Sequence, residues 1–132
     1  MIRILTGLLL VFGLALASSE TTRAADWQAF DQKAFYLAVA SGKGVVLDFH
    51  ADWCPTCKAQ APILAELINS DTTMKMGVVA FKANFDTETT LKQKLGVQKQ
   101  STIVIFKAGK EVTRSTGVTD RAALAELIAK AY

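Results

Sequence analysis

Helical and strand-like patterns of apolar residues alternate along the chain from residue 26 onward. Apolar residues three or four positions apart predict helices, and short β-branched or aromatic runs predict strands. Asp26 is expected to cap the first helix, Asp86 or Thr87 the third, and Thr119 the last. The first predicted helix ends near 41–44 and carries on one face Trp27, Phe30, Ala34, Leu37 and Ala38. It is followed by a strand at 45–50, a helix through 57–68 with Pro62 inside it, and a strand at 77–85. The remaining elements are a short helix closed by Gly96, two strands at 102–107 and 111–116 joined by an Ala108–Gly109 turn, and a helix reaching 131.

This order of elements predicts an α/β fold. Strands that are connected through helices pair in parallel by right-handed crossovers, whereas the two strands of the last hairpin pair antiparallel. We therefore expect a mixed central sheet with helices on both faces, which is a three-layer sandwich. The length of 132 residues fits a single domain.

The N-terminal segment has a different pattern. Residues 4–17 form an uncharged apolar run of 14 residues that follows Arg3. A membrane-spanning helix needs about 20 such residues, whereas this length is typical of a secretory signal. The small residues at 15–17 predict cleavage before Ser18, with cleavage as late as residue 25 as a second possibility. The expected division is a signal peptide at 1–17 and a domain at 26–132 of an exported, periplasmic protein; an uncleaved membrane anchor is the alternative.

The charge of the chain is nearly balanced. There are 15 Lys and Arg residues against 12 Asp and Glu residues, a net charge of +3 that falls to +2 once Arg3 is removed with the signal. The densest basic stretch contains Lys92, Lys94 and Lys99, which a solvated helix face explains. Clustered basic residues with aromatic residues between them, as in nucleic-acid binders, are missing, so no nucleic-acid partner is expected.

Two cysteines, Cys54 and Cys57, carry the candidate chemistry. A disulfide across a two-residue gap closes too short a loop to stabilise a fold. With the single histidine, His50, the cysteines fall short of the four ligands of a structural zinc site, and Lys58 stands where covalent haem attachment requires a histidine. The pair is therefore predicted to be a redox-active dithiol that needs no cofactor and no metal.

The place of the two cysteines in the predicted fold gives them different roles. They lie where the strand at 45–50 ends and the next helix begins, so free backbone N–H groups and the helix dipole favour a thiolate on Cys54. Cys57, one turn into the helix and on its apolar face, is suited to resolve a mixed disulfide formed on Cys54. Pro55 fits the first helical turn, where its missing N–H would be unpaired in any case.

The region around the cysteines resembles the active site of the thioredoxin superfamily. Residues 45–58 read VVLDFHADWCPTCK and are followed by APIL at 61–64, so that a proline, Pro62, stands five residues after the second cysteine. The resemblance covers 27–132 and implies a thioredoxin-like fold and thiol–disulfide oxidoreductase activity. Further matching residues are Lys82, Asn84, Asp86, Gly96, Val97, Thr102, Phe106, Lys107, Gly109 and Gly117.

The resemblance also implies roles for individual residues. Asp48 matches the family's buried acid beneath the second cysteine, which relays a proton when that cysteine attacks, and a nearby Lys82 would lower the pKa of this acid. Both join Cys54 and Cys57 as expected catalytic residues. His50 stands where a tryptophan is common, and it is expected to serve in packing, with tuning of the thiolate as the alternative. The residues expected to contact substrate are Trp53, Pro55, Thr56, Gln100 and Ser101.

Ser101 departs from the family pattern. Thioredoxin-like proteins carry a cis-proline at this position, facing the cysteines and just before the residue that corresponds to Thr102. A cis bond costs about 2.5–4 kcal/mol before a non-proline residue and about 0.5–1 kcal/mol before proline. Either the Gln100–Ser101 bond is cis at that cost, or it is trans and the loop is reshaped. The Ser101 hydroxyl is also expected to donate a hydrogen bond to the Cys54 thiolate and to lower its pKa.

The direction of the reaction follows from two further resemblances. The Pro55–Thr56 dipeptide resembles that of the reducing thioredoxins of cytochrome c maturation, and residues 51–54 resemble a periplasmic reductase domain attached to a membrane electron carrier. Strongly oxidising members usually carry a histidine in the dipeptide and a helical insertion, and this chain has neither. We expect a monomeric reductase of exported proteins' disulfides, recharged by a membrane or periplasmic electron donor.

Two other classes of function remain open at this point. One is a binding module that uses the same scaffold without turnover, because Ser101 replaces the proline. The other is a metal or iron–sulfur carrier in which two chains each contribute Cys54 and Cys57 to one centre.

Overall fold

The structure is a computed structural model that describes residues 27–132. The predicted signal at 1–17 and the cleavage region up to 25 lie outside the described residues, so this division of the chain stays a prediction. Within 27–132, no helix combines the length and the apolar character needed to cross a membrane.

A mixed sheet of five strands forms the centre of the described domain. The strands are β1 (Gln28–Ala29), β2 (Val45–His50), β3 (Val79–Asn84), β4 (Thr102–Lys107) and β5 (Lys110–Thr116). They lie in the order β1-β3-β2-β4-β5. The pairs β1–β3 and β2–β3 are parallel, whereas β2–β4 and the β4–β5 hairpin are antiparallel. The predicted mixed sheet is therefore confirmed.

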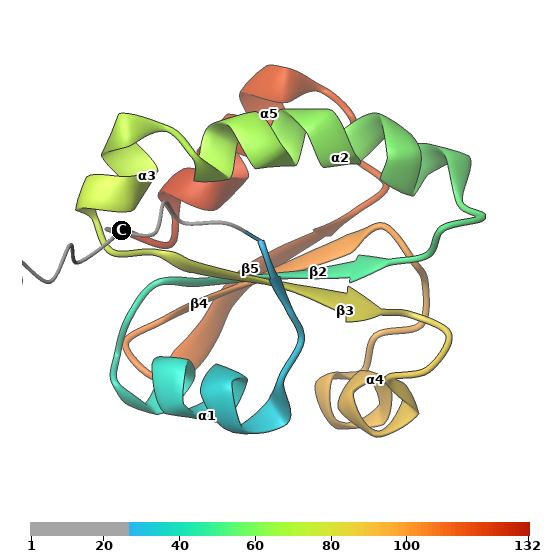
Figure 1. Ribbon diagram of the computed structural model, residues 1–132, viewed down its shortest axis with the longest axis horizontal. Helices are drawn as coiled ribbons and strands as arrows, with labels where there is room; N and C mark the ends of the chain where they lie inside the picture. Colours follow the sequence, from blue (N-terminus) through green and yellow to red (C-terminus); the bar gives the residue numbers. More distant parts are fainter. Residues whose placement is uncertain (1–26) are drawn as a thin grey trace, which may run out of the picture.

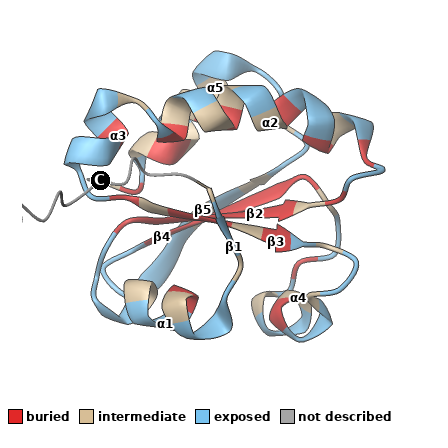
Figure 2. Cartoon of the chain, viewed as in Figure 1, coloured by how far each residue is buried: buried red, intermediate tan, exposed pale blue. Residues whose placement is uncertain are grey.

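Helices cover both faces of this sheet and complete the predicted three layers (Figure 1). On one face lie α2 (Pro55–Ile68), α3 (Asp71–Lys75) and α5 (Arg121–Ala129), and on the other lie α1 (Gln32–Ala40) and α4 (Thr89–Leu95). Because successive side chains of a strand point to opposite faces, β2 serves two cores. Leu47 and Phe49 pack with Phe35 of α1, whereas Val46 packs with Leu64 of α2. Figure 2 shows the buried residues along β2 and on the sheet-facing sides of the helices.

The first helix begins later than the sequence pattern predicts. Asp31, and not Asp26, is its N-cap: the Asp31 carboxylate accepts a hydrogen bond of 2.7 Å from the backbone N–H of Ala34. The residues before it form β1, and the N–H of Phe30 donates to the carbonyl of Lys82 at 2.9 Å. Pairing with the edge of β3 gives hydrogen-bond partners to the backbone groups before Asp31. These residues therefore need no additional helical turn to satisfy them.

Smaller differences occur at other element ends. The short helix α3 was not predicted, because its five residues are too few to show an apolar stripe. β3 begins at Val79 and not at 77, and α5 is capped by Asp120 and not by Thr119. Glu88 precedes α4 without a side-chain cap, in place of Asp86 or Thr87. Lys99 lies in the loop after α4, so a helix face accounts only for Lys92 and Lys94.

The predicted turn between β4 and β5 is present. Ala108 and Gly109 have φ values of 51° and 82°. Two central residues with positive φ match the twist of the flanking strands, which is why this turn type favours short hairpins.

Candidate active site

The two cysteines lie at the end of β2 and the start of α2, as the sequence predicts. Cys54 is the N-cap of α2, and its sulfur accepts a hydrogen bond of 3.1 Å from the backbone N–H of Cys57. Pro55 occupies the first helical turn, where no N–H is needed. Both thiols are free and almost fully buried. The helix N-terminus thus places donor groups on the Cys54 sulfur.

Ser101 brings a third polar group to the two sulfur atoms. Its Oγ atom lies 3.2 Å from Cys54 Sγ and 3.1 Å from Cys57 Sγ. Because a hydroxyl has one proton and two lone pairs, it can donate to one sulfur while it accepts from the other. The arrangement suits a Cys54 thiolate next to a Cys57 thiol.

The surroundings separate the acidities of the two thiols. Burial raises the pKa of Cys54, but hydrogen bonds from the Cys57 thiol, the Ser101 hydroxyl and the backbone outweigh it, so the net pKa lies below its ordinary value. Burial and the hydrogen bond to Cys54 raise the pKa of Cys57. Since the thiolate is the nucleophilic form of a cysteine, these shifts favour Cys54 as the attacking group and favour a protonated Cys57.

The backbone at Ser101 decides between the two conformations left open by the sequence. The Gln100–Ser101 bond is trans, and Ser101 has a φ of 60°. Its N–H donates to the Phe49 carbonyl at 2.9 Å, and its own carbonyl accepts from the N–H of Gly117 at 3.0 Å. A proline at this position has no N–H and holds φ near −65°. The loop is therefore reshaped around the serine.

Gln60 supports this loop and was missed by the sequence reasoning. It is fully buried on α2, where its Nε2 donates to the Val118 carbonyl at 2.7 Å and lies 3.5 Å from the Ser101 carbonyl. The only signal in the sequence is a polar residue three positions after Cys57, on the sheet-facing side of the helix. Gln60 thus connects the helix that carries the cysteines to the two loops facing it.

Asp48 and Lys82 lie side by side, as the resemblance implies. They are partners in the parallel register of β2 and β3. Asp48 is 2% exposed. Burial, partly offset by the positive charge of Lys82, raises the pKa of Asp48 to about 7. A carboxyl with this pKa can both accept and release a proton near neutral pH.

Trp53 forms an exposed aromatic surface next to the cysteines. Its side chain is 57% exposed, and its Nε1–H donates to Asp86 at 2.9 Å. This contact holds the ring in place, and Asp86 was not expected to have that role. Of the other residues expected to contact substrate, Pro55 is exposed, Thr56 and Gln100 are half-buried, and Ser101 is buried.

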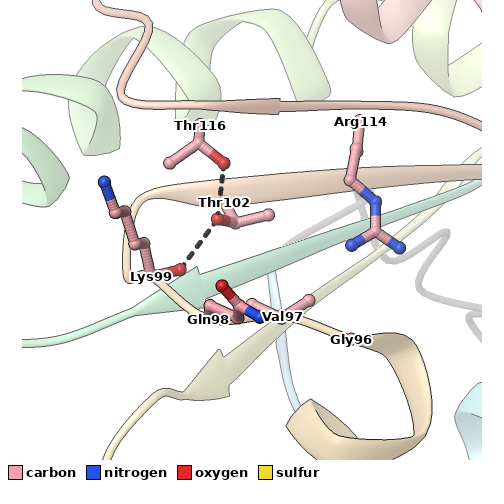
Figure 3. Close-up of a pocket in the computed structure, with 7 residues that line it drawn as sticks. All are labelled: Gly96, Val97, Gln98, Lys99, Thr102, Arg114 and Thr116. Carbon is pink, nitrogen blue, oxygen red and sulfur yellow. Dashed lines mark hydrogen bonds between the residues drawn. The ribbon is translucent and has the colours of Figure 1, made fainter.

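A cavity lies beside the loop that leads to Ser101. It has a volume of about 440 Å³ and is lined by Gly96, Val97, Gln98, Lys99, Thr102, Arg114 and Thr116 (Figure 3). The Thr102 side chain, in its lining, donates from Oγ1 to the Lys99 carbonyl at 2.7 Å and lies 2.8 Å from the Thr116 hydroxyl. Neither cysteine lines this cavity. The hydrogen bonds of Thr102 instead hold the loop that positions Ser101. In residues 27–132, no group of three or more His, Cys, Asp or Glu side chains is placed to hold a metal ion.

Replacing Ser101 with alanine is expected to raise the pKa of Cys54. The substitution removes a hydrogen bond to the thiolate, so the alkylation rate of Cys54 should show its midpoint at higher pH. Each unit of pKa corresponds to about 30 mV in a two-electron potential, and the dithiol should become more reducing accordingly. The control is Ser41→Ala, which alters a hydroxyl at the end of α1. An unchanged midpoint in Ser101→Ala would contradict this role.

Comparisons with known proteins agree with the geometry. The family model for thioredoxin matches residues 26–130. A thioredoxin from Chlamydia muridarum is 36% identical over 103 residues, which are 78% of this chain and 96% of that protein. Mitochondrial thioredoxin-2 from Schizosaccharomyces pombe is 37% identical over 92 residues, 70% of this chain and 65% of that protein. The crystal structure of Trxlp from Edwardsiella tarda superposes with a TM-score of 0.72 at 37% identity, covering 76% of this chain and 98% of that chain.

Proposed function

The chain belongs to the thioredoxin family, and from this premise we propose that it reduces or exchanges disulfides of exported proteins through Cys54 and Cys57. The observation that carries the proposal is the contact set of the Cys54 sulfur, which meets a helix N-terminal N–H and the Ser101 hydroxyl at hydrogen-bond distance. These contacts stabilise a thiolate, which is the form that attacks a disulfide.

In the first step, the Cys54 thiolate attacks one sulfur of the substrate disulfide. A bond forms between Cys54 Sγ and that sulfur, the substrate disulfide breaks, and the other substrate sulfur leaves as a thiolate that takes a proton from solvent. The proposed substrate contacts are Trp53, Pro55, Thr56 and Gln100, of which Trp53 and Pro55 are exposed. The backbone N–H and carbonyl of Ser101 already have partners within the chain, so Ser101 acts on the sulfur atoms.

In the second step, Cys57 resolves the mixed disulfide. Its thiol loses a proton to the Asp48 carboxylate, and the resulting thiolate attacks Cys54 Sγ. The Cys54–Cys57 disulfide forms and the second substrate sulfur leaves as a thiolate that takes a proton from solvent. The substrate thus gains two electrons and the enzyme pair loses two. Asp48 is suited to accept this proton because its pKa of about 7 lies close to neutral pH.

The physiological setting is part of the proposal. The apolar segment at 4–17 supports export, and the Pro55–Thr56 dipeptide supports the reducing direction. The proposed working form is a monomer that needs no bound cofactor. A membrane or periplasmic protein would return electrons to the Cys54–Cys57 disulfide.

The test is reduction of insulin disulfides with a dithiol as the electron donor, combined with the reduction potential of the cysteine pair in a glutathione buffer. We expect turnover and a potential close to that of reducing thioredoxins, about −270 mV. A potential near −120 mV would support an oxidase instead. Absence of turnover in a folded protein with two titratable thiols would favour the non-catalytic binding module.

A further inference from the structure

A second polar cluster lies on the sheet beside the cysteines. Asp48 and His50 are two residues apart on β2, so both side chains point to the face that α2 covers. A cavity of about 270 Å³ opens next to them, lined by Trp27, Ala29, His50, Asp52, Lys82 and Asn84. The cavity thus brings solvent-accessible space to the side of the sheet that holds the buried carboxyl.

His50 stands between two carboxyl groups of very different exposure. Its Nδ1 lies 3.9 Å from Asp48 Oδ2, and its Nε2 lies 3.4 Å from Asp52 Oδ1. The side chains are 3% exposed for Asp48, 13% for His50 and 100% for Asp52. The three groups therefore form a row that runs from the interior to the surface.

Two buried atoms in this row have no partner among residues 27–132. They are Oδ1 of Asp48 and Nδ1 of His50. A neutral imidazole whose Nε2–H points to the Asp52 carboxylate leaves Nδ1 as an acceptor that faces Asp48. The separation of 3.9 Å exceeds a hydrogen bond, so a small side-chain rotation must bring Nδ1 and the Asp48 carboxyl together before a proton passes between them.

We propose that His50 relays the proton of the buried Asp48 carboxyl to Asp52 and solvent during resolution of the mixed disulfide. The inference rests on the proposed function, in which Asp48 takes the proton of Cys57. His50 acts through Asp48 and does not contact the sulfur atoms in this arrangement, so it is a positioning and relay residue.

The relay conserves the proton at every step. Asp48 receives one proton from the Cys57 thiol and passes one to Nδ1 of His50. The Nε2–H bond of the same ring then breaks, and that proton goes to the Asp52 carboxylate or directly to water. Asp48 returns to its carboxylate form, and His50 is left with its proton on Nδ1. Proton exchange with water in the adjoining cavity restores the Nε2–H form before the next turnover, and no electron moves along this path.

The neighbouring charges keep His50 in the form that the relay requires. Burial lowers the pKa of His50, the positive charge of Lys82 lowers it further, and Asp52 partly offsets both effects. Two other elements pack against the row. The helix α2 presents Cys57 toward the sheet, and β4 places the apolar Ile103 opposite Asp48. A mainly neutral imidazole takes up a proton only transiently, as a relay must.

The experiment measures the two chemical steps separately with an aromatic disulfide that releases one coloured thiolate when Cys54 attacks and a second when Cys57 resolves. His50→Phe keeps the bulk of the ring but carries no proton, so the second release should slow about tenfold at pH 7 while the first is unchanged. His50→Ala should show the same slow step and recover its rate when free imidazole is added to the buffer. Asp71→Asn, which removes an exposed carboxylate on α3, is the charge control.

The outcomes separate the relay from the function on which it rests. If His50→Phe resolves as fast as the wild-type protein, or if imidazole fails to restore His50→Ala, then His50 only fills space and the relay is wrong. If the wild-type protein itself shows no second release, the proposed function fails, whatever the variants do. A slow second step in His50→Phe together with rescue of His50→Ala supports the relay.

Discussion

Replacing Cys54 with serine is expected to eliminate disulfide exchange, whereas replacing Cys57 with alanine should leave the first step intact and stop the second. A serine hydroxyl at the helix N-terminus forms no disulfide, so Cys54→Ser lacks the thiolate that attacks the substrate. In Cys57→Ala the Cys54 thiolate keeps the Ser101 hydroxyl at 3.2 Å and the backbone N–H of residue 57 at 3.1 Å. This variant should therefore still attack substrates and accumulate as a stable mixed disulfide.

The measurement is mass spectrometry of the Cys57→Ala variant after capture in the native compartment, alongside insulin reduction by both variants. The captured chains would identify the substrates and the electron donor. The matched control is the double variant Cys54→Ser with Cys57→Ala, which should capture nothing. Efficient capture by Cys54→Ser alone would instead make Cys57 the attacking residue and reverse the assignment of the two sulfurs.

Replacing Asp48 with asparagine is expected to stabilise the protein at pH 8 by about 4 kcal/mol and to have almost no effect near pH 4. Folding raises the pKa of Asp48 from 3.8 to about 7, and a rise of about three units corresponds to this free energy at about 1.4 kcal/mol per unit. The folded state binds the extra proton between these values, so the wild-type protein loses stability as the pH rises from 4 to 7. Asparagine is neutral throughout and avoids this loss.

Urea unfolding of both proteins from pH 4 to pH 8 checks this expectation, since the difference between them isolates Asp48 from other titrating groups. The same variant should slow the second thiolate release, because Asp48 is the proposed acceptor of the Cys57 proton. A stability difference that does not change with pH would show that the carboxyl is not desolvated in the folded state. The buried acid thus destabilises the fold at neutral pH, which is understandable if it serves catalysis.

The parts of this protein that follow from neighbours in sequence were predicted well. The helices and strands of the core, the turn at Ala108–Gly109 and the place of the cysteines at a helix start all depend on periodicity and capping over a few residues. The errors lie in two short elements that were not predicted, β1 and α3, and at the ends of longer elements, where several caps compete. Asp26 and Thr119 are acceptable caps by residue type. Pairing of β1 with β3 moves the start of α1 to Asp31, and Asp120 caps α5 by accepting a hydrogen bond from the N–H of Ala123.

The sequence by itself determined the fold class and the Cys54–Cys57 pair, because both are expressed in local patterns and in a short motif. Only the tertiary structure decided what surrounds the two sulfurs. Ser101 is 47 residues from Cys54 in the chain, and its contact with both sulfurs depends on its trans peptide bond and positive φ. The row from Asp48 through His50 to Asp52 likewise depends on side-chain directions at the end of β2. Such contacts arise from the register of strands and the packing of loops. Both depend on residues that are distant from one another in the sequence.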